Sequence, residues 1–203
     1  MVKNKGVGIT RGGKQISPLF GQSIKEDMQR KIIFVGGVHG VGKTTLCNSL
    51  CSKFNVIHHS ASDLISKLKQ IDLPSNKRVE NIDENQDALI TAINEYLEFD
   101  KHYLLDGHFC LLDQDKRVTK IPLSTYTAIS PMAVLLLYDD PRNIYSRLKE
   151  RDKERYNMDL LVSFQQEEIL YSESVASGLN IPYLKANPFM DSEKIDKFVV
   201  SLL

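Results

Sequence analysis

The chain has 203 residues, 42% hydrophobic and 26% charged, which is typical of a soluble globular protein with one full hydrophobic core. Lys and Arg together number 26, as do Asp and Glu, so net charge gives no indication of nucleic-acid or membrane binding. The start of the chain lacks the apolar stretch of a signal peptide, and the apolar run 133–138 is too short to span a bilayer. We therefore expect a cytoplasmic protein without a membrane segment.

Residues 1–30 differ from the rest in composition. No acidic residue precedes Glu26, and five of the eleven glycines fall here, at Gly6, Gly8, Gly12, Gly13 and Gly21. Such a stretch has too little apolar content to form a core. We expect a Gly-rich basic N-terminal extension over 1–30, which is either solvated or in contact with a nucleic acid or protein partner.

From Lys31 onward, predicted strands and helices alternate. Short apolar runs predict strands at 32–35, 56–58, 103–106, 132–138 and 181–185. Helical spacing and capping signals predict helices at 43–53, 62–71, 83–99, 124–129, 141–151, 159–178 and from 192, with an irregular hairpin within 109–122. This alternation predicts an α/β fold over 31–203, with a parallel sheet covered on both faces.

Polar residues at two helix starts and a glycine at one end provide the capping signals. Asp140 and Pro141 are expected at the N-cap and first position of one helix, and Asp159 at the N-cap of the next. Gly178 is expected at the C-terminal end of that second helix.

The segment from Gly37 to Thr44 fits the pattern G-x-x-x-x-G-K-[ST] at every fixed position, between a predicted strand and a predicted helix. A glycine-rich loop can wrap its backbone N–H groups around phosphate oxygens, and the following helix directs its N-terminal dipole at the anion. Lys43 is expected to neutralise the β- and γ-phosphates, and the Thr44 hydroxyl to ligate Mg²⁺. The sequence predicts an ATP site formed by Gly37, Val38, His39, Gly40, Val41, Gly42, Lys43, Thr44 and Thr45, with His39 as a spacer.

Two groups of acidic residues follow predicted strands. Asp106 lies at the carboxyl end of a strand, where ligands of parallel sheets bind, and we expect it to hold Mg²⁺ through water. Asp139 and Asp140 occupy a similar position, but capping by Asp140 accounts for that pair. Nearby, His108 either contacts the transferring phosphate or completes a loop.

Cysteines and the remaining histidines are assigned to structure. Cys47 and Cys51 share one helix face and are expected to be buried; with Cys110 they imply neither a disulfide framework nor a zinc site. We attribute His58 and His59 to the end of their strand rather than to chemistry.

A basic run covers the end of the helix predicted at 141–151. Five cations fall within nine positions, at Arg147, Lys149, Arg151, Lys153 and Arg155. On a continued helix the three arginines share one face, and guanidinium groups suit phosphate oxygens. The alternative is a salt-bridged surface helix, because acidic residues alternate with these cations.

Four segments together resemble the adenylate kinase group of P-loop kinases: GGVHGVGKTT, LLDGH at 104–108, LLLYDDP from 135, and RLKER at 147–151. The likeness is closest to archaeal-type adenylate kinases and adenylate-kinase-like ATPases. It implies a P-loop NTPase three-layer sandwich with a five-stranded parallel sheet in the order 2-3-1-4-5. It also implies a small lid at about residues 151–158.

The resemblance also implies roles for individual residues. Arg147 matches the arginine that lies against adenine, and Asn187 and Pro188 match the loop that meets the adenine edge. Arg151 and Arg155 match phosphate-contacting arginines, so Lys43, Asp106, Arg151 and Arg155 form the expected catalytic set. On the acceptor side, the candidates are Ser62, Asp63, Arg78 for the phosphate, Gln86 for the base, and His108.

Three functions remain open, each using ATP and Mg²⁺. The first, which we favour, is phosphorylation of a nucleoside monophosphate, a small-molecule acceptor whose oxygen is already ionised. The second is phosphorylation of a hydroxyl on a small molecule or polypeptide, with Asp106 taking the proton. The third is slow ATP hydrolysis by a switch protein that contacts a partner, for example through residues 1–30.

Overall fold

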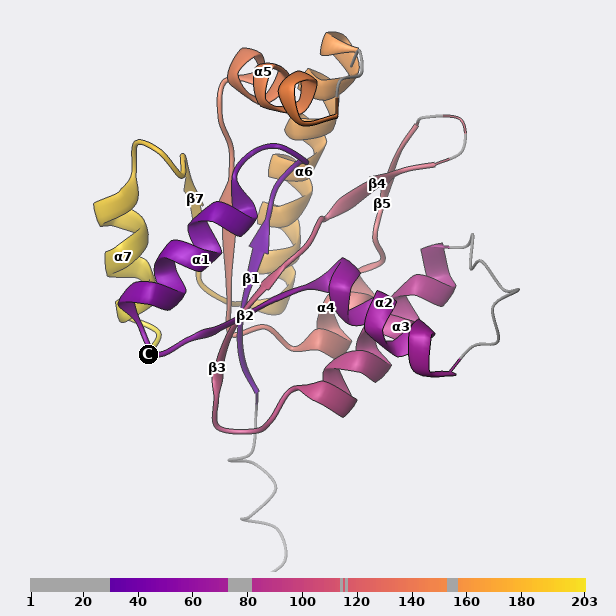
Figure 1. Ribbon diagram of the computed structural model, residues 1–203, viewed down its shortest axis with the longest axis vertical. Helices are drawn as coiled ribbons and strands as arrows, with labels where there is room; N and C mark the ends of the chain where they lie inside the picture. The colour runs from indigo at the N-terminus through magenta and orange to yellow at the C-terminus, as the bar shows by residue number, and fades with distance from the viewer. Residues whose placement is uncertain (1–29, 73–81, 114, 116, 153–156) are drawn as a thin grey trace, which may run out of the picture.

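The computed structural model describes residues 30–72, 82–113, 115, 117–152 and 157–203 (Figure 1). These residues form a five-stranded parallel sheet in the spatial order β2-β3-β1-β6-β7. The strands are β1 (Lys31–Gly36), β2 (Ile57–Ser60), β3 (His102–Asp106), β6 (Ala133–Leu137) and β7 (Tyr183–Ala186). Counted within this sheet alone, the order is 2-3-1-4-5, and the predicted fold is confirmed.

The register of the strands aligns their carboxyl ends at one edge of the sheet. Asp106 pairs with Val35 of β1 on one side and with Ser60 of β2 on the other. The loops that leave β1, β2 and β3 therefore begin side by side. In a parallel sheet this edge forms the ligand crevice.

Helices cover both faces of the sheet (Figure 1). On one face lie α1 (Lys43–Lys53) and α7 (Ser192–Val200). The other side carries α2 (Ala61–Asp72), α3 (Ile82–Tyr96), α4 (Leu123–Ile129) and α6 (Met158–Leu179), while α5 (Pro141–Asp152) lies beyond the carboxyl edge. This arrangement is the three-layer sandwich expected for alternating strands and helices.

Alternating side chains of β1 divide the core in two. Ile33 and Val35 belong to the cluster that contains α1 and α7 residues, whereas Ile32 and Phe34 belong to the cluster beneath α3, α4 and α6. All four are at most 2% exposed. Burying each such side chain contributes about 1.5–3 kcal/mol, so β1 is a firm support for the loop that follows it.

An antiparallel hairpin leaves the carboxyl edge shortly after β3. Its strands are β4 (Cys110–Leu112) and β5 (Val118–Lys120). At its base, the Ile121 amide donates to the Phe109 carbonyl. The hairpin predicted within 109–122 is therefore confirmed.

The helix caps partly differ from the sequence predictions. Asp140 caps α5 as predicted, because its carboxylate accepts the Arg142 amide at 2.8 Å. Asn157, not Asp159, caps α6 by accepting the Leu160 amide at 3.1 Å. The same helix continues through Gly178 to Leu179, and its C-cap Asn180 adopts the left-handed conformation (φ 53°) that asparagine tolerates well.

Several predictions lie outside the described residues. These include most of the N-terminal extension, Arg78, Arg155 and the centre of the lid at 151–158, so the roles assigned to them stay predictions. Arg30 is described and belongs to the domain, since its guanidinium donates to the Leu97 carbonyl at 2.7 Å. Among the helices of the described segments, none combines the length and apolar character needed to cross a bilayer.

We expect Asn157→Ala to lower the free energy of unfolding by about 1 kcal/mol, because an amide of α6 loses its capping oxygen. Asp159→Ala removes only a favourable first-turn charge and should cost about half as much. Urea denaturation of both variants measures the difference. A larger loss for the Asp159 variant would contradict the assigned cap.

Candidate active site

The loop between β1 and α1 is tightly bent through its glycines. Gly37, Gly40 and Gly42 have φ angles of 137°, 76° and 111°. A Cβ atom at Gly37 would lie 2.6 Å from the Leu137 carbonyl oxygen, and one at Gly40 would lie 2.8 Å from Cγ of Leu148. Side chains are thus excluded on steric as well as conformational grounds, as a backbone cradle for phosphates requires.

The Lys43 side chain is buried behind this loop. It is 8% exposed, and Nζ donates to the carbonyls of Gly37 at 2.5 Å and Val38 at 3.2 Å. Burial lowers the pKa of Lys43, although the charges of Asp106 and Glu168 oppose the shift. Within the described segments no carboxylate forms an ion pair with this ammonium. A buried cation held only by neutral groups suits an anionic ligand such as a triphosphate.

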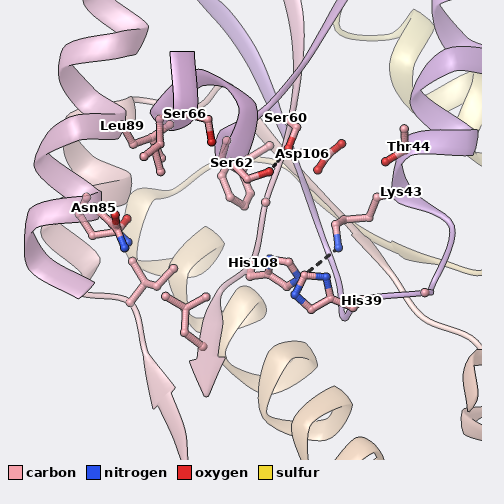
Figure 2. A pocket seen from close by; sticks show the side chains of 18 of the residues that line it. His39, Lys43, Thr44, Ser60, Ser62, Ser66, Asn85, Leu89, Asp106 and His108 are labelled. Carbon is pink, nitrogen blue, oxygen red and sulfur yellow. Dashed lines mark hydrogen bonds between the residues drawn. The ribbon is translucent and has the colours of Figure 1, made fainter. Parts of the chain in front are cut away.

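Asp106 faces Thr44 and Lys43 across the same crevice (Figure 2). Its carboxyl group is 2.6 Å from Nε2 of His58, so His58 has a partner in the site and does more than end its strand. Mg²⁺ prefers oxygen ligands, and the Thr44 hydroxyl and the Asp106 carboxylate offer them. The chemistry of this donor pair therefore fits the predicted Mg²⁺ site.

The buried thiol of Cys47 lies close to Asp106 and His58. One ligand atom each of Cys47, His58 and Asp106 lies within 4.8 Å of the others. Burial and the nearby Asp106 charge raise the pKa of the Cys47 thiol well above its usual range. The thiol is thus protonated, and Asp106 is the member of this group suited to Mg²⁺.

Two histidines pack beside Lys43. The rings of His39 and His108 have centroids 4.2 Å apart, and Nε2 of His108 lies 3.3 Å from the Lys43 Nζ. Burial, assisted by the Lys43 charge, lowers the pKa of His39 to about 4 and that of His108 well below 6.5. Both rings are neutral at pH 7, so His108 accepts the ammonium hydrogen bond at Nε2 and carries its proton on Nδ1.

One cavity of about 840 Å³ extends from the P-loop, the segment Gly37 to Thr44, to α2 and α3 (Figure 2). Twelve predicted site residues line it: His39, Gly40, Gly42, Lys43, Thr44, Thr45, Ser62, Gln86, Asp106, His108, Arg147 and Arg151. Most of the residues predicted from the sequence are thus brought together.

Other predicted site residues lie outside the lining. The Val38 and Val41 side chains are fully buried in the core, and the Gly37 carbonyl accepts a hydrogen bond from Lys43. Asp63 lies on the exposed side of α2. Asn187 and Pro188 also lie outside the lining. The Asn187 side chain donates to the Asp139 carboxylate, and Pro188 lies next to Gly42.

The far half of the cavity contains residues that sequence reasoning missed. Its polar members include Ser66, Lys69, Asn85 and Thr125, and its apolar walls include Ile65, Leu89, Leu111 and Tyr126. Lys69 Nζ donates to the Asn85 side chain at 2.6 Å, which joins α2 to α3. No motif marks these positions, because they come from four elements that only the fold brings together.

Asp139 organises the opposite wall, and attributing the Asp139–Asp140 pair to capping missed this role. It is 5% exposed, and its carboxylate accepts from Arg147 at 2.5 Å and from the Asn187 amide at 2.9 Å. Burial would raise the pKa of Asp139, but hydrogen bonds led by that from Arg147 lower it overall. Arg147 also donates to the Gly40 carbonyl at 2.8 Å and lies 4.7 Å from the Phe189 ring centroid. Two predicted adenine-site residues are thus tied together and to the P-loop.

Comparison with known proteins agrees with this geometry. Residues 36–163, more than half of the chain, match the family AAA_17, described as AAA domain. The chain belongs to this family. A curated relative, adenylate kinase 1 of Schistosoma mansoni, is 31% identical over 99 residues, which cover 44% of this chain and 50% of the relative.

The chain thus spans half the length of that curated relative. The match to adenylate kinase 1 agrees with the resemblance to the adenylate kinase group of P-loop kinases that the sequence motifs indicate. A gluconokinase structure from Sinorhizobium meliloti 1021 has a TM-score of 0.41 and 15% identity, covering 75% of this chain and 94% of its own.

We expect Asp139→Ala to lower the free energy of unfolding by about 3 kcal/mol at pH 7. The reason is that Arg147 and Asn187 lose the buried carboxylate that accepts their hydrogen bonds. A carboxyl group with a lowered pKa stabilises the fold above its ordinary pKa of 3.8 and loses that effect as pH falls below it. The difference in unfolding free energy between wild type and variant should therefore be smaller below pH 3.8 than at pH 7. Urea denaturation at pH 7 and at a pH below 3.8 measures it.

Asp140→Ala serves as the matched control, since it removes only a cap and should cost about 1 kcal/mol. Equal losses for the two variants would contradict the role assigned to Asp139.

Proposed function

We propose that this protein transfers the γ-phosphoryl group of Mg²⁺-bound ATP to a nucleoside monophosphate. The observation that supports it is one shared cavity, which extends from Lys43 of the P-loop, past Asp106, to the surfaces of α2 and α3. Two substrates bound in one cavity can meet without a covalent intermediate on the protein. Catalysis then consists mainly of alignment and charge stabilisation.

On the ATP side, the P-loop backbone and Lys43 would hold the phosphates. Arg147 and Arg151 line this half of the cavity and supply guanidinium groups. Thr44 directly and Asp106 through water would hold the Mg²⁺ ion, which when bound neutralises charge on the β- and γ-phosphates.

On the acceptor side, the cavity combines apolar walls with polar side chains. Leu89 and the Tyr126 ring offer apolar contacts, while Ser62, Asn85 and Gln86 offer hydrogen-bonding groups. This mixture suits a nucleobase, whose faces are apolar and whose edge is polar. The relative named adenylate kinase 1 also supports a nucleotide acceptor.

A second candidate is phosphorylation of a hydroxyl group. It is favoured by the contact between Asp106 and His58, because a carboxylate with an imidazole partner can accept a hydroxyl proton. An ionised phosphate acceptor needs no such base.

Incubation with Mg²⁺-ATP and separate panels of nucleoside monophosphates and nucleosides distinguishes the two candidates. We expect one nucleoside monophosphate to yield its diphosphate with an equal amount of ADP, followed by chromatography. Product from a nucleoside instead would favour the second candidate. ADP and phosphate formation that no acceptor alters would point to an ATPase switch and contradict the proposal.

Lys43→Ala should lower kcat/KM by at least about 100-fold, because it removes the cation nearest the transferred group. Lys53→Ala, at the other end of α1, removes an exposed pair with Asp196 and should leave transfer unchanged. Thermal melts of both variants check that they fold. A folded Lys43 variant with wild-type kinetics would refute the proposed site.

A further inference from the structure

Glu168 of α6 is a buried carboxylate for which the phosphoryl-transfer chemistry above has no use. It is 1% exposed, and its oxygens accept three backbone N–H groups: Gly37 at 3.2 Å, Phe109 at 2.9 Å and Cys110 at 2.7 Å. One oxygen accepts from Gly37 and Phe109, and the other accepts from Cys110. A single side chain thus joins Gly37 to Phe109 and Cys110, which lie more than 70 positions further along the chain.

The two loops belong to different halves of the cavity. Gly37 begins the P-loop, and its carbonyl holds the Lys43 ammonium at 2.5 Å. Phe109 follows His108, and Cys110 is the first residue of β4. The next residue of that strand, Leu111, lines the acceptor side. The distance between the ATP half and this wall of the acceptor half is therefore fixed through the Glu168 carboxylate.

We propose that Glu168 is a positioning residue for phosphoryl transfer, which holds the P-loop and the acceptor-side loop in register. This inference rests on the proposed function, because register matters only if two substrates meet. Misplacing reacting groups by about 1 Å can cost about 100-fold in rate, so a clamp between the loops has a direct kinetic consequence.

The hydrogen-bond pattern requires an ionised carboxylate. All three partners are donors, so both oxygens must accept, and a glutamine would turn its own N–H₂ group toward a backbone N–H. Protonation weakens the pattern, because the hydroxyl oxygen is a poorer acceptor and its hydrogen finds no acceptor among the three N–H groups. The clamp is therefore strongest in the charged form.

The charged form is costly at this position. Burial raises the pKa of Glu168 to about 7, although the three N–H groups and the Lys43 charge oppose the shift. Among the described residues, the Cys110 thiol and the Tyr126 hydroxyl also face Glu168. Burial is the main cause that raises the pKa of each, so both stay neutral. The clamp should therefore weaken as pH falls through about 7.

Backbone amide resonances test the clamp without any activity. In a pH titration of the nucleotide-free wild-type protein by NMR, the amides of Gly37, Phe109 and Cys110 should shift together with one midpoint near 7. Glu168→Gln should abolish that shared midpoint. Glu167→Gln is the matched control: Glu167 is the next residue on the same helix and pairs with Lys120 on the surface at 3.4 Å.

Kinetics test the positioning role. Glu168→Gln should lower kcat by about 10- to 100-fold with little change in ATP affinity, since alignment rather than binding is lost. The acid limb of the wild-type kcat profile should be absent in this variant, and Glu167→Gln should match wild type. If Glu168→Gln fails to fold, Glu168→Asp, which keeps the charge but shortens the reach, replaces it with the same expected loss.

Two results would overturn the inference. One is the lack of a common midpoint for the three wild-type amides; the other is a folded Glu168 variant with wild-type kcat. A shared midpoint in a protein that phosphorylates no acceptor would instead refute the proposed function and leave the clamp itself intact.

Discussion

The structure depends on one buried ammonium group. Lys43 lies beneath the glycine-rich loop with its charge held by two main-chain carbonyls and one neutral imidazole. Such a cation is poorly compensated by its own protein, and an anion at the loop would compensate it. Gly37 links this ammonium to the Glu168 carboxylate, because its carbonyl accepts from Lys43 and its N–H donates to Glu168. Charge and loop geometry are therefore coupled.

The sheet determines where this chemistry can occur. Alternating side chains of β1 are buried in two separate clusters, which leaves the strand little freedom to move. Parallel pairing then brings the ends of β1, β2 and β3 to one edge, so that Asp106, Ser60 and the P-loop share the cavity. A shift of β3 by one residue would turn the Asp106 side chain to the other face of the sheet, so Asp106 and Lys43 would no longer share the cavity.

Local sequence features predicted the elements that depend on local interactions. The P-loop, the strands and most helix positions follow from glycine spacing, apolar runs and the Asp140 cap. Roles that depend on distant partners could not be read in this way. Glu167 and Glu168 are chemically identical neighbours, yet one pairs with Lys120 on the surface and the other is buried against two loops. His58 and Asp139 likewise owe their roles to partners that only the fold supplies.

The most direct test is a crystal structure with Mg²⁺ and a non-hydrolysable ATP analogue. We expect the triphosphate to lie along the backbone of the glycine-rich loop, with the Lys43 ammonium turned from the Gly37 and Val38 carbonyls to a phosphate oxygen. The metal should contact the Thr44 hydroxyl. A triphosphate bound elsewhere, with Lys43 still on its two carbonyls, would contradict the account.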